Sequence, residues 1–516
     1  MTFLPLQRLL AAKGMWRVPA LTWAVVCLVI QSPALQNRSF EPDEGMRVYC
    51  ARQLLQGQLP YRDFWDHKDP VEWFLCGLLL KVFGDSLIGL RLGVNVLRAL
   101  LIYHLAAFGH QSRATKNLWL LGGLAFVLLT SETIQGNTAG MEAPGLLLFI
   151  LAMRIALLAA EVSGARRCIF LTACGTCAGL GILVKTTTAV ACLAPLILLA
   201  SVANSPTNSR TRTRFAVDMA LLISGLLIPV IVVACWCLRH GIFHDWLFVL
   251  TVYNPAYSQS IPHGDYLSGV LPSRLWFLLP FTALGVLGFL RKSHWRPWVR
   301  ICIGAWFVCA ALSVSVGWRF YPHYFLLLAP PLALMGANAI QFSSTGDSRN
   351  APLRTALTAA ISFAVVFNSA HAIKWYLVDV REWEPPQLGF FTTESVNNLT
   401  LHIRETTKPD EPIYVFGYCP DIYVLSNRRA ASRFSFLYPL AAEHSPLRQE
   451  ASREVLLDLS TSRPKYIVVM KKDWTPQYPA ESVQFVRDWP EMSAFLEDNY
   501  RLEDSQDLFD LYITSA

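Results

Sequence analysis

Charged residues are concentrated in one short stretch near the N-terminal end of this 516-residue chain. The stretch contains Glu41-Pro42-Asp43-Glu44-Gly45, then Pro60-Tyr61-Arg62-Asp63, and then His67-Lys68-Asp69-Pro70. It lies between long apolar runs, and ionisable groups are costly to place beside lipid, so such a concentration indicates chemistry. A carboxylate that accepts a proton, beside cations that hold a phosphate, suits the transfer of a group from a phosphate to a hydroxyl or amine.

The elements that must position this stretch are membrane helices. Hydrophobic residues make up 53% of the sequence and charged residues only 16%, and apolar runs recur from residue 17 to about residue 375. This composition is typical of a protein that crosses the membrane many times. Arg8, Lys13 and Arg17 precede the first apolar run. No small-residue cleavage site follows them, so we interpret that run as an uncleaved first helix.

The hydropathy pattern predicts about eleven transmembrane helices. The segment 71–83 carries Glu72 and Lys81 and is too short to cross roughly 30 Å of hydrocarbon, so we interpret it as an interfacial helix. The expected spans are 18–35, 86–109, 117–131, 142–160, 168–183, 186–203, 215–238, 272–290, 300–317, 321–341 and 353–375.

The basic residues predict the orientation of these spans. With the N-terminus in the cytoplasm, most later Lys and Arg residues fall in cytoplasmic loops, for example Arg166-Arg167 and Arg296, as the positive-inside rule requires. Counting 71–83 as a span would invert those loops. The first outer loop, residues 36–85, breaks the rule because it holds several cations, and we attribute them to function. We expect a multi-pass protein of the cell inner or plasma membrane, with Asp63 and Trp474 on the outer side.

The composition turns polar after residue 375, which divides the chain into a transmembrane domain, 1–375, and a small soluble α/β domain, 376–516, on the outer side. The expected strands are 413–417, 466–470 and 508–513, and the expected helices are 392–406, 447–460 and 481–498. Tyr418-Cys419-Pro420-Asp421 and Asn427-Arg428-Arg429 follow the first strand, where open sheets bind ligands. Acceptor recognition and packing against the membrane domain both remain open for them.

Several kinds of site are absent from the sequence. There is neither a P-loop nor a GxGxxG motif between a strand and a helix, so no nucleotide cofactor is expected. The twelve cysteines are scattered without a CxxC pair, which argues against a zinc site or a disulfide framework. The net charge of +7 is spread over loops, so nucleic acid is not an expected partner. A divalent cation stays possible, but no regular ligand spacing assigns a metal site.

Short motifs follow one another in a recognisable order along the membrane domain. They are Pro42-Asp43-Glu44-Gly45, Gly57, Pro60-Tyr61-Arg62-Asp63, Lys68, Pro70, Phe83-Gly84, Arg91, Glu142, Lys185 and the segment 319–324 before Pro330. This order resembles the GT-C superfamily of integral membrane glycosyltransferases, and most closely the bacterial group similar to protein O-mannosyltransferases and to the lipid A aminoarabinose transferase. The resemblance implies a polyprenyl-phosphate-linked sugar as donor and an active site on the outer face. Met46 departs from the pattern, because some relatives place a cation there.

The resemblance also implies roles for individual residues. Asp43 is the expected catalytic base, since relatives place the catalytic Asp first in this Asp-Glu pair, and Glu44 and Glu142 are the further catalytic candidates. The expected donor phosphate site consists of Lys68, Lys185, Arg319, His323 and Tyr324.

Several of these residues also have a purely structural interpretation. Asp43 is placed where it would cap a helix from about 44 to 56, and Glu142 would complement the dipole of the helix that it opens. Lys68 could extend to the lipid headgroups. The 319–324 segment could form an interfacial belt of aromatic and cationic side chains.

Two function classes remain at this point. The favoured one is an inverting glycosyltransferase of the mannosyltransferase-like type, which moves a hexose or pentose from a polyprenyl phosphate to a lipid, glycan or protein acceptor of the cell envelope. The alternative is a transporter or flippase of a lipid-linked or small polar substrate. Transporters commonly show paired halves, whereas this chain shows no halving and concentrates its charge in one outer loop, which favours the enzyme.

Overall fold

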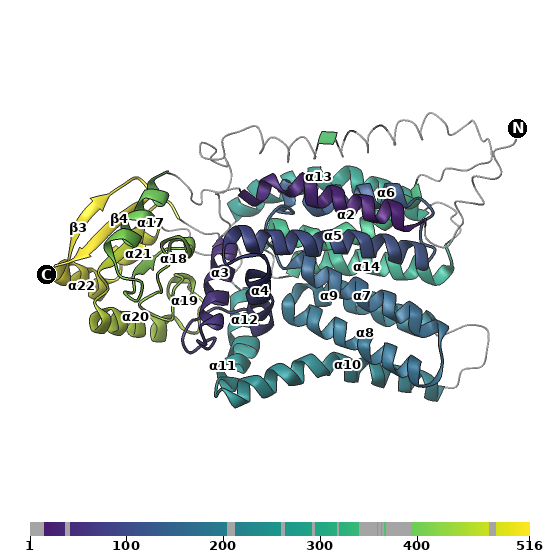
Figure 1. Cartoon of the computed structure of the whole chain (residues 1–516), viewed down its shortest axis with the longest axis horizontal. Coiled ribbons are helices and arrows are strands. Elements are labelled where there is room, and N and C mark those ends of the chain that lie inside the picture. The colour runs from purple at the N-terminus through teal and green to yellow at the C-terminus, as the bar shows by residue number, and fades with distance from the viewer. Residues whose placement is uncertain are drawn as a thin grey trace, which may run out of the picture.

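The computed structural model describes residues 15–36, 42–203, 212–259, 264–290, 295–316, 319–339, 394–473 and 481–515, with residues 359, 363, 366 and 367. They form a helical bundle joined at one end to a smaller unit that contains a β-sheet (Figure 1). Apart from those four single residues, the expected span 353–375 lies outside the described residues. Residues 376–393 also lie outside them, so the division between the two domains stays a prediction.

The expected spans up to 341 each coincide with observed helices. Among the described residues, six helices are long and apolar enough to cross a membrane, and α2 and α6 are shorter apolar helices. The six are α5 (Leu87–Gln111), α7 (Glu142–Glu161), α8 (Gly164–Val184), α10 (Arg212–Arg239), α13 (Gly264–Leu290) and α14 (Pro297–Ser315). The remaining helices at expected spans are α2 (Arg17–Gln31), α6 (Leu118–Thr130), α9 (Thr187–Ala203), and η5 (Pro322–Leu328) followed by α15 (Ala329–Ala339). The predicted polytopic helical architecture is confirmed.

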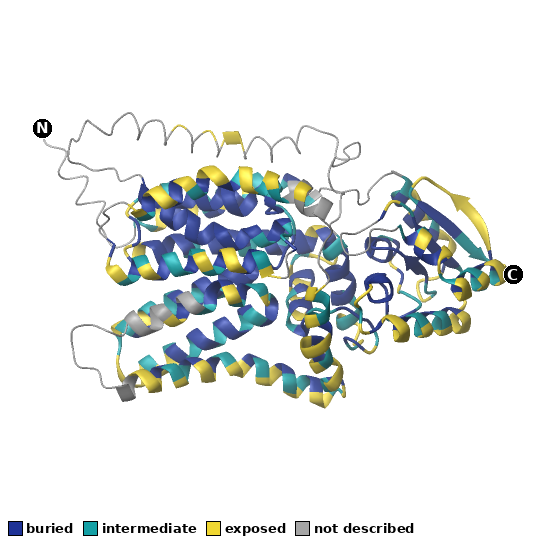
Figure 2. Ribbon diagram, turned by 180° about the vertical axis from the view of Figure 1, so that it is seen from behind, coloured by how far each residue is buried: buried dark blue, intermediate teal, exposed yellow. Residues whose placement is uncertain are grey.

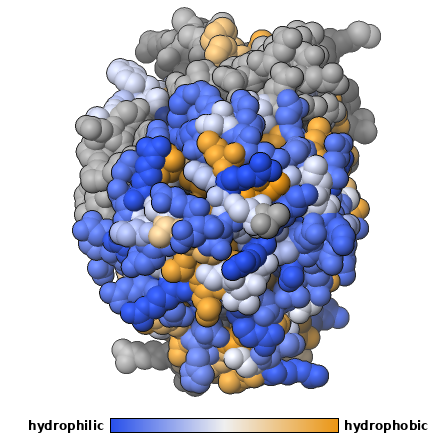
Figure 3. Space-filling model, turned by 90° about the vertical axis from the view of Figure 1, so that its left-hand side faces the viewer, coloured by the Kyte–Doolittle hydropathy of each residue, from blue (hydrophilic) through white to orange (hydrophobic). Residues whose placement is uncertain are grey.

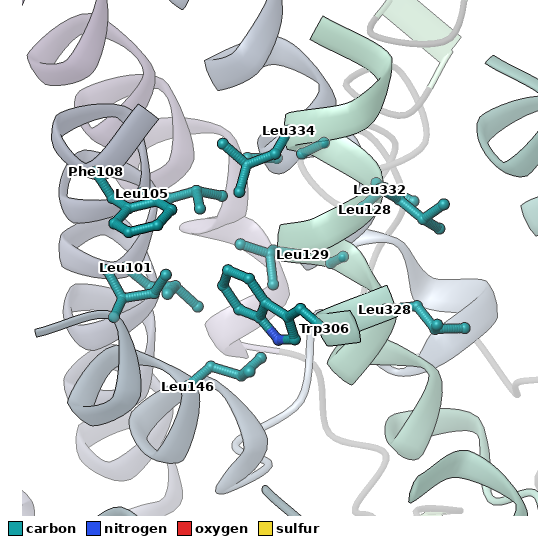
Figure 4. Packing of buried hydrophobic residues seen from close by; sticks show 14 of the residues in the cluster. Leu101, Leu105, Phe108, Leu128, Leu129, Leu146, Trp306, Leu328, Leu332 and Leu334 are labelled. Atoms are coloured by element: carbon teal, nitrogen blue, oxygen red, sulfur yellow. The ribbon is translucent and has the colours of Figure 1, made fainter. Parts of the chain in front are cut away.

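The core of the bundle is built from side chains of α5, α6, α7, α14 and α15. Trp306 is fully buried there and its ring lies edge-on to Phe108 (Figure 4). Buried residues face the inside of the bundle and exposed residues lie on its outside (Figure 2). Large apolar side chains are exposed on the outer helices, for example Trp276 on α13 and Val232 on α10. Such a surface suits contact with lipid.

Short helices cover the end of the bundle that faces the α/β unit (Figure 1). They are η1 (Pro33–Gln36), α3 (Pro42–Leu55), α4 (Pro70–Phe83), η2 (Glu132–Ile134), α11 (Phe243–Phe248), the π-helical turn η3 (Val249–Tyr253) and α12 (Asn254–Gln259). The α4 helix coincides with the segment that we expect to be an interfacial helix. Asp69 caps it by accepting from the backbone N–H of Val71 at 2.9 Å. Phe74, Leu78 and Val82 are exposed along one of its faces, in keeping with a helix that lies in the membrane surface.

The C-terminal part, residues 394–473 and 481–515, is called the α/β unit below. Its sheet has the order β1-β2-β4-β3, in which β1 and β2 are parallel and the other neighbouring pairs are antiparallel. The strands are β1 (Tyr414–Phe416), β2 (Tyr466–Met470), β3 (Tyr500–Ser505) and β4 (Phe509–Thr514). The helices are α17 (Glu394–Thr406), α18 (Asp421–Ser426), α19 (Tyr438–Ala441), α20 (Arg448–Ser462), α21 (Ser482–Arg487) and α22 (Pro490–Asn499).

The α/β unit confirms the three expected strands and adds details that the sequence did not reveal. The strand β3 was not expected, because all but its first residue are exposed and its sequence lacks a hydrophobic alternation. The expected helix 481–498 is interrupted before Pro490, which begins α22. The face of the unit that points away from the bundle is mostly hydrophilic (Figure 3), as expected for a part of the chain outside lipid.

Candidate active site

Asp43 lies in the first turn of α3, at the end of the bundle next to the α/β unit. One of its carboxylate oxygens accepts from the guanidinium of Arg47 at 3.1 Å, and the other accepts from the ammonium of Lys68 at 3.3 Å. The side chain of Asp43 is 32% exposed, so a substrate can reach it. Burial raises the pKa of the Asp43 carboxyl, but Lys68 and Arg47 hold it well below its usual range. Asp43 is therefore a carboxylate, able to accept a proton.

Lys68 comes from the loop between α3 and α4, residues 59–69, called the site loop below. Its ammonium lies between Asp43 and Asp66, 3.0 Å from the latter, and its side chain is largely buried. Burial lowers the pKa of Lys68, whereas Asp43 and Asp66 raise it above its usual value. Burial raises the pKa of Asp66, but Lys68 and His67 bring it down to about 2. Lys68 thus stays a cation shared by two carboxylates, instead of extending to headgroups.

Two further contacts tie the start of α4 to its neighbours α3 and α11. Arg47 donates to Glu72 at 2.7 Å while it also holds Asp43, so it connects the first turns of α3 and α4. Asp69, the cap of α4, also accepts from the indole N–H of Trp246 at 3.0 Å. Burial raises the pKa of Asp69 to about 6.

A second group of residues meets beside the first. Lys185, in the turn between α8 and α9, lies 2.9 Å from Glu142 at the start of α7. The Nε2 atom of His323 lies 3.8 Å from the same carboxylate, and its Nδ1 atom lies 3.0 Å from the side-chain oxygen of Gln135. The ammonium of Lys185 also lies over the ring of Tyr324. Three separate segments of the membrane domain therefore converge here.

The two groups form one electrostatic unit. Lys185 and His323 both contribute to lowering the pKa of Asp43, after the larger contributions of Lys68 and Arg47. Six of the eight residues that the sequence singled out are brought together in this way: Asp43, Lys68, Glu142, Lys185, His323 and Tyr324.

Glu44 points to a different part of the molecule. It has no exposed surface and forms a two-point ion pair with Arg91 of α5, at 2.6 and 3.1 Å. One of its oxygens also accepts from the backbone N–H of Ala139 at 2.6 Å. Successive residues of a helix face about 100° apart, so Asp43 and Glu44 cannot face the same space. Glu44 ties α3 to α5 and to the segment before Glu142.

Arg319 lies at the edge of the site. Its guanidinium stacks on the ring of Tyr257 with 3.5 Å between the guanidinium carbon and the ring centroid, and it donates to the hydroxyl of Tyr321 at 3.2 Å. Tyr321 in turn stacks on His323. Arg319 is therefore linked to the Lys185 group through aromatic rings.

Four polar residues of the site were not expected there from the sequence: Arg47, Asp66, Glu72 and Gln135. A signal for Arg47 was available, because a residue four positions after Asp43 on a helix lies on the same face. Asp66 lies two residues before Lys68, but only the loop conformation shows that the two side chains meet. Within the described ranges, no group of three His, Cys, Asp or Glu side chains is arranged to hold a metal ion.

A solved structure has the same architecture as this chain. No family model and no curated protein sequence matches the chain. Among solved structures, the crystal structure of ArnT from Cupriavidus metallidurans bound to undecaprenyl phosphate matches with a TM-score of 0.58 and 13% sequence identity. The match covers 98% of this chain and 99% of that one. This chain has the ArnT fold.

The likeness to ArnT extends over the membrane helices and the α/β unit together. At the level of the fold, it confirms the resemblance that the order of the motifs indicated. At this level of identity, the comparison with ArnT establishes the fold alone.

Proposed function

We propose that this protein is a membrane glycosyltransferase that moves a sugar from a polyprenyl phosphate to an acceptor of the cell envelope. The observation that carries the proposal is the contact between an accessible carboxylate, Asp43, and a buried cation, Lys68, 3.3 Å away at one end of a membrane bundle. The polyprenyl phosphate bound to ArnT, a protein of the same fold, supports this choice of donor.

The proposed reaction needs a base and a stabilised leaving group. The acceptor hydroxyl or amine attacks the anomeric carbon of the sugar while Asp43 takes its proton. The bond between that carbon and the phosphate oxygen breaks, and the polyprenyl phosphate leaves with the electron pair. Attack from the face opposite the phosphate inverts the anomeric centre. A phosphate is a good leaving group, so cations rather than a general acid are required beside it.

Lys68 and Lys185 are the proposed cations for the donor phosphate, with His323, Tyr324 and Arg319 around them. In the structure, Lys68 is held by Asp43 and Asp66. A donor phosphate that engages Lys68 competes with those carboxylates. Because Lys68 lowers the pKa of Asp43, loss of that contact raises the pKa and makes Asp43 a stronger base. The base is then activated when the donor is in place.

We propose positioning roles for Glu142 and Glu44. Neither has exposed surface, so neither reaches an acceptor in this conformation. The carboxylate of Glu142 holds Lys185 at 2.9 Å and thereby fixes one phosphate-binding cation. Glu44 fixes the start of α3, which carries Asp43, against α5.

The site is proposed to lie on the outer face of the membrane. The α/β unit contacts the site loop, since Arg433 donates to the backbone oxygen of Tyr61 at 2.6 Å. Both must therefore lie on the same side of the bilayer. The positive-inside argument from the sequence assigns that side to the outside, with the N-terminus in the cytoplasm.

The test uses purified full-length protein, a polyprenyl-phosphate-linked sugar and a panel of lipid, glycan and peptide acceptors. Sugar transfer and release of polyprenyl phosphate are followed in the same samples, and equal amounts of both products are expected. If the lipid-linked sugar is bound or moved across a vesicle bilayer while its bond to phosphate stays intact with every acceptor, the protein is a transporter instead.

A further inference from the structure

The helix that carries Asp43 is packed against the α/β unit along its opposite face. Gly45 lies so close to α18 that a Cβ atom there would sit 2.9 Å from the backbone nitrogen of Asp421. Real Cβ atoms essentially never approach a backbone nitrogen that closely. The two helices are therefore in direct backbone contact within one turn of Asp43.

Two hydrogen bonds extend this contact along α3. The hydroxyl of Tyr49 accepts from the backbone N–H of Ala430 at 3.0 Å, and Arg52 donates to the backbone oxygen of Val424 at 2.9 Å. Residues 45, 49 and 52 are spaced four and three apart, so they share one face of the helix. These contacts with the α/β unit thus hold α3 against both sliding along its axis and rotation about it.

The same unit also holds the site loop. Arg433 donates to the backbone oxygen of Tyr61 at 2.6 Å, and its own backbone oxygen accepts from the N–H of Trp65 at 2.9 Å. Tyr61 has a positive φ of 66°, a conformation that a large side chain rarely adopts without support. The Tyr61 hydroxyl donates to the backbone oxygen of Lys68 at 2.9 Å. A continuous chain of contacts therefore runs from Arg433 to Lys68.

Arg433 is itself firmly anchored in the α/β unit. Its guanidinium makes two bonds to Glu454 of α20, at 2.6 and 2.7 Å, and one to Glu450 at 3.0 Å. A guanidinium held at two points by a carboxylate has little freedom to turn. The nitrogen that reaches Tyr61 is therefore directed by α20.

We propose that Arg433 is a positioning residue through which the α/β unit sets the separation of Lys68 from Asp43. Asp43 and Lys68 belong to different segments, α3 and the site loop, and both segments are clamped by this one unit. The inference rests on the proposed function, in which Asp43 is the base and Lys68 holds the donor phosphate. Because the attraction of two charges falls with distance, the clamp also sets how easily Asp43 accepts a proton.

The test compares Arg433→Met with Lys471→Met in the full-length protein. Lys471 is paired with Asp510 inside the same unit, so its substitution removes a cation and an ion pair without touching the site loop. Hydrogen exchange of 42–55 and 59–69, and the pH dependence of sugar transfer, are measured for each. In Arg433→Met we expect faster exchange in both segments and a fall in turnover of about tenfold or more. The control should change neither.

The pH profile separates positioning from simple loss of stability. Asp43 is faced by Arg47, Lys68, Lys185 and His323, and Lys68 makes the largest favourable contribution to its low pKa. Moving Lys68 away raises the pKa of Asp43, so the acid limb of the rate profile should move to higher pH in Arg433→Met. A protein that is only less stable would lose active molecules without moving that limb.

Two outcomes overturn the inference: exchange in 42–69 that equals that of the control, or an acid limb that does not move. If Arg433→Met fails to fold, Glu454→Gln takes its place, because it weakens the anchor of Arg433. We expect smaller changes of the same kind in that variant, and their absence would also overturn the inference. If the wild-type protein transfers no sugar, the proposed function is wrong. The exchange measurement would still decide whether Arg433 and its unit hold α3 and the site loop in place.

Discussion

The ammonium of Lys68 lies 3.3 Å from the carboxylate of Asp43, and 3.0 Å from that of Asp66 on its other side. In this arrangement, the cation proposed to hold the donor phosphate and the carboxylate proposed as the base neutralise each other. In the proposed mechanism, a donor phosphate that engages Lys68 takes it from Asp43, so donor binding also activates the base. We therefore expect the donor to bind before the acceptor.

The first prediction concerns the cations. Lys68→Met, Lys185→Met and Arg319→Met should each weaken the binding of polyprenyl phosphate by roughly tenfold or more, since a charge-assisted hydrogen bond contributes about 1.5 to 3 kcal/mol. Acceptor affinity should stay nearly unchanged. Titration of purified protein with polyprenyl phosphate measures the effect, and Lys81→Met on the exposed side of α4 is the control. Effects on unrelated steps would contradict a common phosphate site.

The second prediction concerns Asp421, which is buried at the contact with α3. Burial raises the pKa of Asp421 to about 7, and among the described residues its Oδ2 atom has no hydrogen-bond partner. The folded-state pKa lies above the unfolded value of about 3.9. The contribution of Asp421 to the free energy of unfolding is therefore highest below the unfolded value, where the carboxyl is protonated in both states. It falls as the pH rises from there through about 7.

Asp421→Asn cannot ionise and should escape that loss. Its melting temperature should exceed that of the wild type by a margin that grows between pH 5 and pH 8. Thermal unfolding at a series of pH values measures this, with the exposed Asp410→Asn as control. A margin independent of pH would show that Asp421 is not buried as a titrating carboxyl.

The third prediction uses two glycines on adjacent helices. Gly45→Ala should destabilise the protein by about 1 to 3 kcal/mol and lower turnover, because its methyl group would meet the rigid backbone of α18. Gly77→Ala on α4 is the matched control, because its methyl group meets only the side chain of Leu55, at 3.3 Å or more. That variant should be neutral or slightly stabilising. Equal effects in denaturant unfolding would argue against the close contact of α3 and α18.

The fourth prediction concerns topology. Single cysteines at Arg62 and Lys472, both with exposed side chains, should react with an impermeant maleimide in intact cells, whereas one at Arg296 should react only after lysis. The exposed Cys168 and Cys235 are first replaced by serine. Labelling of position 296 in intact cells without labelling of 472 would invert the predicted orientation.

The membrane helices could be predicted from the sequence because hydrophobicity alone specifies a segment that crosses lipid. The buried strands β1 and β2 could be predicted for the same reason, since every residue in them is buried and apolar runs mark them. The strand β3 could not, because it is exposed and owes its conformation to pairing with β4. The break before Pro490 could have been inferred, since proline begins helices more readily than it continues them.

The sequence indicated many of the residues of the candidate site, but not which side chains contact one another there. Because Met46 stands where some relatives have a cation, the sequence did not show which cation lies beside Asp43. In the structure this cation is Arg47, one position later and on the same face as Asp43. The direction of Glu44 depends on Arg91 of α5 and on the backbone at Ala139, both far away in sequence. The segment after β1 is buried against α3, which favours packing over acceptor recognition there. Such tertiary contacts leave no local signal.

The most direct measurement is sugar transfer by Asp43→Asn, together with its affinity for polyprenyl phosphate. An amide cannot take the acceptor's proton, so turnover should fall by about two to four orders of magnitude. Donor binding should be retained, since Lys68 and Lys185 remain. Asp85→Asn, which replaces an exposed carboxylate between α4 and α5, should transfer sugar normally. Near-normal transfer by a folded Asp43→Asn protein that binds the donor would contradict the assignment of Asp43 as the base.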